Sequence, residues 1–167
     1  ADKLVLRFGG SLVEQLGAQL YPSVTATVAE LISNAWDADA RHVWVTAPFG
    51  EAWTPDSEIV VTDDGHGMTR QQAQEAYLVV GRKRRLTPLG AKSEGGRYVH
   101  GRKGIGKLAA FGTAGILECN TVRTGVQTAF RLDYDEIRKL DPAADYEVED
   151  LAPSELRAPD GTPLEHG

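Results

Sequence analysis

The sequence has few of the features that mark secreted, zinc-binding or membrane-spanning proteins. Cys119 is the only cysteine among 167 residues, which excludes a disulfide framework and a cysteine-based zinc cluster. No apolar run approaches the ~18 residues of a transmembrane helix, and the first residues lack a signal-peptide pattern. We therefore expect a soluble, intracellular protein, cytoplasmic in location and without a membrane partner.

The rest of the composition suits one ordinary globular domain. Apolar residues make up 41% of the chain, and its length allows a sizeable core. The net charge of -6 is unevenly distributed. Residues 82–107 contain nine Lys or Arg and one acid, Glu94, a local charge of +8, so the remaining residues carry -14. A polyphosphate ligand or a nucleic-acid partner would explain this basic segment, and so would a solvated loop.

Apolar periodicity and turn residues predict a chain of alternating strands and helices. Thr124-Gly125-Val126 predicts a hairpin turn, and the proline-interrupted sequence after 133 predicts loop with one short helix. Residues 81–101 have no apolar period, and their glycines suggest a mobile lid over a ligand. We expect a short strand or an extended arm at 4–8 and strands at 42–46, 58–62, 115–124 and 127–133. Helices are expected at 11–16, 23–38, 69–80, 108–111 and 135–140.

The helix expected over 23–38 presents a polar face. At about 100° per residue, Glu30, Asn34 and Asp37 share one side, and the apolar residues cluster on another. An acid four residues before an amide can place a general base beside a ligand for a hard cation. A solvated helix face would show the same spacing.

Two glycine-containing stretches follow. Asp63-Asp64-Gly65-His66-Gly67-Met68 comes directly after the apolar run 59–61, and its glycines allow positive φ or close approach to a ligand. Gly101-Arg102-Lys103-Gly104-Ile105-Gly106-Lys107 precedes a short apolar helix, where exposed N–H groups can bind an anion. A P-loop would need a hydroxyl where Leu108 stands, and the dinucleotide fingerprint would need an upstream strand.

The three stretches, in this order, resemble the GHKL ATPase superfamily of DNA gyrase B, ninety-kilodalton heat-shock chaperones, histidine kinases, MutL and MORC proteins. The resemblance runs from about residue 12 to the end. It implies one Bergerat-type ATP-binding domain over 1–167, the N-terminal part of a longer protein. The fold implied is a two-layer α/β sandwich, with helices on one face of a mixed, mostly antiparallel sheet. An acid at position 30 favours the ATP-hydrolysing branch, nearest to MutL, MORC and chaperone ATPases.

The resemblance also implies roles for individual residues. Glu30 matches the catalytic acid that activates water, Asn34 the amide that holds magnesium, and Asp37 an acid near the nucleotide. Asp63 matches the acid that accepts the adenine amino proton, although the adjacent Asp64 leaves this choice open. The remaining adenine-side matches are Gly65, Gly67 and Met68.

The phosphate-side matches are Gly101, Gly104, Ile105 and Gly106, with Lys103 and Lys107 as cation partners. Many members of the superfamily have a further threonine, later in the chain, that contacts phosphate. Its match here is either Thr162 or a residue beyond His166-Gly167. The lid spans about 81–103.

The activity implied is magnesium-dependent ATP hydrolysis that drives lid closure and dimerisation, slow in the isolated domain. Two other readings remain open at this stage. The domain is a regulatory module that binds ATP with negligible hydrolysis, or a nucleic-acid-binding module that uses the basic segment. A protein client would be a further partner.

Overall fold

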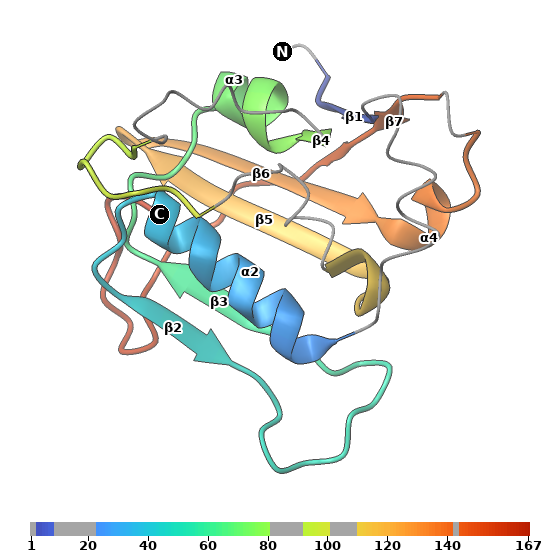
Figure 1. The fold of residues 1–167 in the computed structure, drawn as a ribbon, viewed down its shortest axis with the longest axis horizontal. Helices are drawn as coiled ribbons and strands as arrows, with labels where there is room; N and C mark the ends of the chain where they lie inside the picture. The colour runs from blue at the N-terminus through green and yellow to red at the C-terminus, as the bar shows by residue number, and fades with distance from the viewer. Residues whose placement is uncertain (1–2, 9–22, 81–91, 101–109, 142–143) are drawn as a thin grey trace.

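The computed structural model describes residues 3–8, 23–80, 92–100, 110–141 and 144–167. Within them the strands form mostly antiparallel pairs, and helices lie against them, as Figure 1 shows. The predicted two-layer α/β sandwich is therefore confirmed.

The longest strands form the predicted hairpin. β5 (Ile116–Arg123) and β6 (Val126–Asp133) pair in antiparallel register along their full lengths. Thr124 and Gly125 join them with φ values of 50° and 76°, the geometry that matches a two-residue turn to the twist of its strands. β8 (Glu149–Asp150) adds to the free edge of β6.

Shorter strands complete the sheets. β1 (Val5–Phe8) lies between β4 (Val79–Val80), which is parallel to it, and β7 (Tyr146–Glu147), which is antiparallel. β2 (Val43–Thr46) and β3 (Val60–Asp63) form a separate antiparallel pair. β2, and β3 to within two residues at each end, lie where the sequence predicted them.

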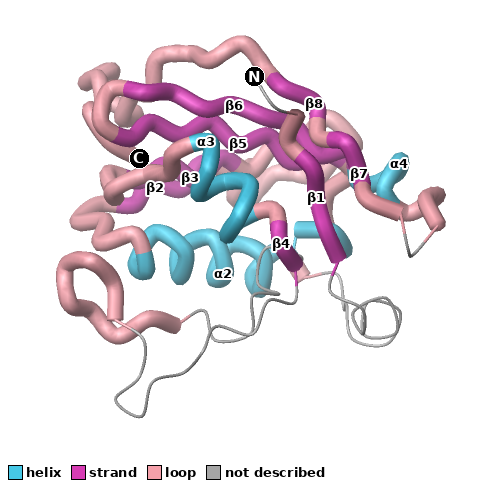
Figure 2. The backbone as a smooth tube through the Cα atoms, turned by 90° about the horizontal axis from the view of Figure 1, so that it is seen from above, coloured by secondary structure: helices cyan, strands magenta, loops and turns pink. Residues whose placement is uncertain are grey.

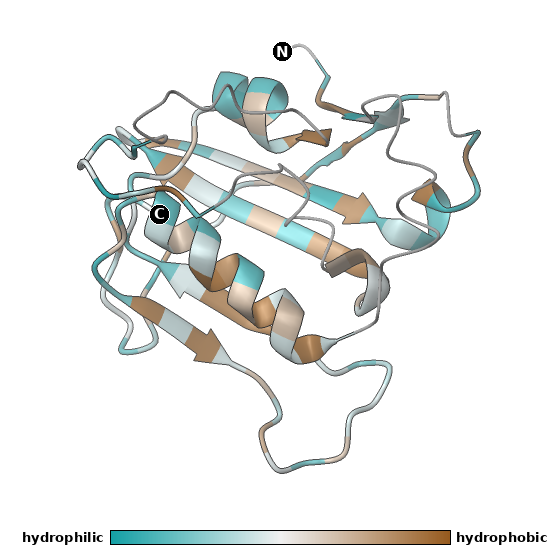
Figure 3. Ribbon diagram, in the orientation of Figure 1, coloured by the Kyte–Doolittle hydropathy of each residue, from teal (hydrophilic) through white to brown (hydrophobic). Residues whose placement is uncertain are grey.

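Helix α2 (Val24–Asp37) forms where the sequence predicted it. Ser23 caps its first turn, because the hydroxyl accepts a hydrogen bond from the backbone N–H of Ala26 at 3.2 Å. Thr27 and Ala35 are buried. Figure 2 shows α2 on the same side of β5 and β6 as the next helix along the chain, α3 (Arg70–Gln72). Figure 3 shows polar and apolar bands alternating along α2.

The helix predicted over 69–80 is shorter than expected. Thr69 and Gln72 form a capping box at the start of α3 (Arg70–Gln72), and the helix continues as the π-helical turn η1 (Ala73–Tyr77). It ends at Leu78, because Val79–Val80 pairs with β1 as a strand. The β-branched pair gains ladder hydrogen bonds that the helix could not give it.

The C-terminal region also differs from the prediction. α4 (Tyr134–Ile137) is one turn capped by the Asp133 side chain, shorter than the predicted helix. The strands β7 and β8 lie where only loop was expected. Residues 110–112 form a 3₁₀ turn, whereas the helix predicted at 11–16 lies outside the described residues.

The hydrophobic core lies between the sheets and the α3–η1 segment. Phe130, Leu78 and Val80 are fully buried in it, and Tyr77 packs against Phe130 with ring centroids 5.8 Å apart. The core brings together residues from both ends of the chain, and its buried members are Leu4, Leu6, Ala73, Leu78, Val80, Ala110, Phe130, Leu132, Tyr134, Ile137, Tyr146 and Val148.

Candidate functional site

Helix α2 carries Glu30 and Asn34, the predicted acid and amide. Glu30 is half-buried and Asn34 is exposed. In the described part of the chain, neither side chain makes a hydrogen bond or an ion pair. Thr27, which lies close to the side of Glu30 and Asn34 at about 100° per residue, is buried, as is Ala35, which lies about 100° around the helix from Asn34. A carboxylate and an amide oxygen, both of which can accept hydrogen bonds, therefore lie one turn apart on this helix.

The end of α2 packs directly against the turn that carries Asp63. The carbonyl of Ala38 accepts a hydrogen bond from the His66 N–H at 2.9 Å. A Cβ atom on Gly65 would lie 2.8 Å from the Ala38 carbonyl oxygen and 2.7 Å from Asp63 Oδ1. Only glycine allows this approach. The fold therefore brings two of the three sequence stretches into contact.

Asp64 is committed to holding the start of β2. Its Oδ1 accepts hydrogen bonds from the backbone N–H groups of Arg41 and His42 at 2.7 and 2.8 Å, and its Oδ2 lies 2.7 Å from His42 Nδ1. Burial raises the pKa of Asp64, but the hydrogen bonds from His42 and Arg41 outweigh it and lower the pKa overall. This carboxylate has a structural role.

The two oxygens of Asp63 differ in their contacts with the described residues. Its Oδ1 accepts a hydrogen bond from the Gly65 N–H at 2.8 Å, and no described residue donates to its Oδ2. Burial raises the pKa of Asp63, and the neighbouring charge of Asp64 adds to this, while the Gly65 bond opposes it. A carboxylate oxygen without a donor among the described residues is an acceptor that could bind an amino group.

Gly67 is tightly enclosed by protein backbone. At its φ of 64°, a Cβ would lie 2.1 Å from the Val122 carbonyl oxygen and 2.7 Å from that of Gly167. Val122 and Gly167 exchange two backbone hydrogen bonds, and the Met68 N–H donates to Thr121 Oγ1 at 2.9 Å. The fold therefore needs glycine at this position, and the predicted contact of Gly67 with a nucleotide base stays a prediction.

Part of the predicted lid is docked on the end of α2. Asp39, at a φ of 62°, accepts hydrogen bonds from Ser93 Oγ at 2.5 Å and from the Gly95 N–H at 2.6 Å. These two bonds lower the pKa of Asp39. Asp37 accepts from the His100 N–H at 2.8 Å. Asp37 therefore holds the backbone directly before Gly101.

Aromatic and cationic groups extend this contact. Trp36 Nε1 donates to the Tyr98 carbonyl at 3.0 Å. The Arg97 guanidinium lies 4.5 Å from the centre of the Trp36 ring and donates to the Ala40 carbonyl at 2.7 Å. Among residues 81–103 the structure describes only 92–100, and this part is anchored to the helix that carries Glu30.

The other predicted site residues are placed elsewhere or lie outside the description. Thr162 is exposed in a turn, where its N–H donates to Asp160 Oδ1 at 2.9 Å and its carbonyl accepts from Ala158 at 2.9 Å. None of these contacts involves the Asp63–Met68 turn; Gly167 is the residue that packs there. Outside the described residues are Gly101, Lys103, Gly104, Ile105, Gly106 and Lys107.

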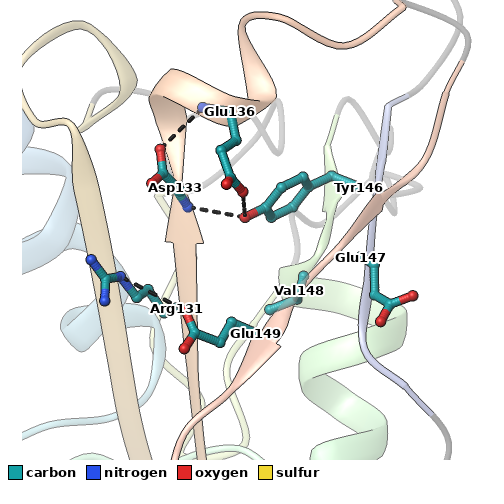
Figure 4. A pocket seen from close by; sticks show the side chains of 7 residues that line it. All are labelled: Arg131, Asp133, Glu136, Tyr146, Glu147, Val148 and Glu149. Carbon is teal, nitrogen blue, oxygen red and sulfur yellow. Dashed lines mark hydrogen bonds and ion pairs between the residues drawn. The ribbon is translucent and has the colours of Figure 1, made fainter.

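A separate cavity of about 480 Å³ lies among β6, α4, β7 and β8 (Figure 4). The Tyr146 hydroxyl donates to Glu136 Oε2 at 3.2 Å inside it, and burial is the main cause of the raised pKa of Tyr146. Four carboxylates against one guanidinium would repel a polyphosphate. The cavity contains none of the predicted site residues, and its lining is Arg131, Asp133, Glu136, Tyr146, Glu147, Val148 and Glu149.

The described residues contain no group of three or more His, Cys, Asp or Glu that could hold a metal ion. None of the described helices is long and apolar enough to span a membrane.

Sequence reasoning missed Asp39, Glu94 and Arg123. Arg123 Nη2 donates to both Glu94 carboxylate oxygens, at 2.8 and 3.0 Å. An acid just past a helix end, where Asn and Asp tolerate positive φ, was a signal for Asp39. No local pattern links Arg123 to Glu94, because the two residues meet only through the fold.

The family model described as histidine kinase-, DNA gyrase B-, and HSP90-like ATPase matches residues 21–162. The chain is also 34% identical over 134 residues, 80% of its length, to a Herpetosiphon aurantiacus protein named putative type II restriction enzyme HgiDII. It spans 20% of that relative's length.

Proposed function

The chain belongs to the family of histidine kinase-, DNA gyrase B- and HSP90-like ATPases, and we propose that it binds ATP with Mg²⁺ and hydrolyses it between α2 and the Asp63–Met68 turn. Its family membership makes it an ATPase-type, ATP-binding domain. The observation that carries the finer proposal is the hydrogen bond from His66 to Ala38. This contact holds the turn with Asp63 against the helix with Glu30 and Asn34.

At the adenine end, Asp63 Oδ2 accepts a hydrogen bond from the exocyclic amino group. The Gly65 N–H holds the other carboxylate oxygen at 2.8 Å and so orients the group. Guanine presents a carbonyl oxygen at the same position, which a carboxylate repels. Met68, half-buried beside the turn, supplies an apolar wall for the base.

At the phosphate end, Glu30 accepts a proton from the water that attacks the γ-phosphate. Asn34 offers its amide oxygen to Mg²⁺, which neutralises phosphate charge when bound. Asp37 holds the backbone at His100, the residue before the glycine-rich segment. We assign the phosphate contacts to that segment: the N–H groups of Gly101, Gly104, Ile105 and Gly106, and the cations Lys103 and Lys107.

The test separates catalysis from binding on one helix. Glu30→Ala should keep ATP affinity and lower turnover by about 100-fold or more, because the lost base acts on water. Asn34→Ala should instead lose the gain in ATP affinity that Mg²⁺ provides. Ser33→Ala is the matched control, because the one bond of the Ser33 hydroxyl to a described residue goes to the Ala29 carbonyl within the helix.

Calorimetric ATP titrations and phosphate-release assays on the full-length protein measure both quantities. If Glu30→Ala hydrolyses ATP at the rate of the unmutated protein, Glu30 is not the base. ATP binding with background turnover in the unmutated full-length protein would instead support the regulatory module.

A second function concerns the whole protein. The Herpetosiphon relative is named a putative type II restriction enzyme, and residues 82–107 carry a charge of +8. We propose that the full-length protein binds DNA and that this domain is its ATP-driven module. DNA affinity should fall linearly on a log–log plot against salt. Absence of binding at low salt, with and without ATP, would contradict this function.

A further inference from the structure

Arg123 joins two parts of the proposed site. It is the last residue of β5, and its side chain is 18% exposed. Nη1 donates to the Gly67 carbonyl at 3.3 Å and lies 3.0 Å from His66 Nδ1. Nη2 holds both oxygens of Glu94. One guanidinium therefore contacts the Asp63–Met68 turn and the 92–100 segment at the same time.

The same segment is tied to α2 on its other side. Ser93 and Gly95, the neighbours of Glu94, both donate to Asp39, which lies just beyond the helix that carries Glu30 and Asn34. Residues 93–95 therefore connect the end of α2 to the end of β5. We call the set Asp39, residues 93–95 and Arg123 the clamp.

We propose that Arg123 is a positioning residue for ATP. Because it contacts both Gly67 and Glu94, it keeps the Asp63–Met68 turn and the 92–100 segment in a fixed position relative to α2. This inference rests on the proposed ATP site. Arg123 acts through the protein, because its contacts are with His66, Gly67 and Glu94. The fork geometry of a guanidinium makes this double contact possible, whereas a lysine ammonium would have to choose one partner.

The hydrogen bond and charge of Arg123 lower the pKa of Glu94, which favours the ionised carboxylate in this pair. The Glu94 side chain is 61% exposed, and salt screens such a pair. The contribution of the clamp to binding should therefore weaken as ionic strength rises.

The experiment uses Glu94→Gln and Arg123→Lys, with Glu118→Gln as the matched control. Glu118 is an exposed acid on the same strand, 4.0 Å from Arg131. Without nucleotide, ¹⁵N relaxation should show lower order at the Gly95 amide in both clamp variants. ATP should then bind about two- to fivefold more weakly, with kcat unchanged, and high salt should remove the difference for Glu94→Gln.

The outcomes separate the clamp from the ATP site. Unchanged order at Gly95 in both variants would overturn the clamp, whether or not ATP binds. If the variants show lower order at the Gly95 amide but bind ATP as tightly as the unmutated protein, Arg123 has a structural role only, and the positioning role is overturned. An unmutated protein that does not bind ATP would overturn the proposed function itself, while the relaxation data would still report on the clamp.

Discussion

Adjacent carboxylates in this protein have opposite electrostatic environments. Asp64 is hydrogen-bonded to the backbone N–H groups of Arg41 and His42 and to the His42 ring, and its pKa is lower than the usual value for aspartate. Asp63 is raised in pKa, mainly by burial, so its charge costs stability in the absence of a ligand. The sequence could not assign the ligand-facing acid to one of the two. Their hydrogen bonds favour Asp63, since only its Oδ2 lacks a described donor.

Asp63→Asn should therefore stabilise the ligand-free protein and weaken ATP binding. Asparagine keeps the oxygen that accepts from Gly65 and removes the buried charge. Because the pKa of Asp63 is raised in the folded state, the protein with aspartate at this position loses folding stability as pH rises through that pKa. The stability gain of the variant should be absent below about pH 4 and grow above it. Urea unfolding across this pH range measures it.

The same variant should bind ATP about 5- to 150-fold more weakly, because the amino group of adenine loses its acceptor. Asp64→Asn is the control. It should lose stability with little effect on ATP affinity, because the acid holds Arg41 and His42. Equal affinity of the unmutated protein for ATP and GTP would remove the basis for the Asp63 assignment.

At the same scale, the sequence located site residues that share one helix or one turn. Glu30 and Asn34 were predictable because helical spacing alone puts them on one side. The Arg123–Glu94 pair was not, because the residues are 29 positions apart and only the packing of β5 beside the 92–100 segment brings them together. Ion pairs across a fold leave no periodic signal.

Among the elements, those stabilised by local interactions were predicted most accurately. Ser23 marks the start of α2, and Thr124-Gly125 sets the β5–β6 turn. The two-residue strands β4, β7 and β8 were missed, because each exists only through a partner strand distant in sequence. Too few residues take part for alternation to appear.

The segment at 92–100 illustrates a further limit of sequence patterns. Its glycines and lack of apolar period predicted a mobile lid, which stays a prediction, and the structure shows contacts with side chains at the end of α2 that these patterns did not predict. Trp36, Asp37 and Asp39 supply these contacts. Loops anchored by side chain-to-backbone bonds have the same composition as unanchored ones, so composition alone does not distinguish them.

Across the whole molecule, the two signs of charge occupy different regions. Residues 82–107 carry +8 in a chain of net charge -6, and the cavity in Figure 4 is lined by four carboxylates. Phosphates would neutralise the basic region and remove the mutual repulsion of its cations. Nucleotide binding is thus expected to favour a closed arrangement of 81–103.

We expect this closure to promote dimerisation of the full-length protein, while the isolated domain remains monomeric. Sedimentation with Mg²⁺ and a non-hydrolysable ATP analogue measures the mass, and hydrogen exchange over 81–101 measures closure. With ATP itself, Glu30→Ala should stay dimeric because it retains nucleotide, and Asn34→Ala should stay monomeric. Protection without a change in mass would keep the closure and exclude the dimer. No protection at saturating nucleotide would exclude both.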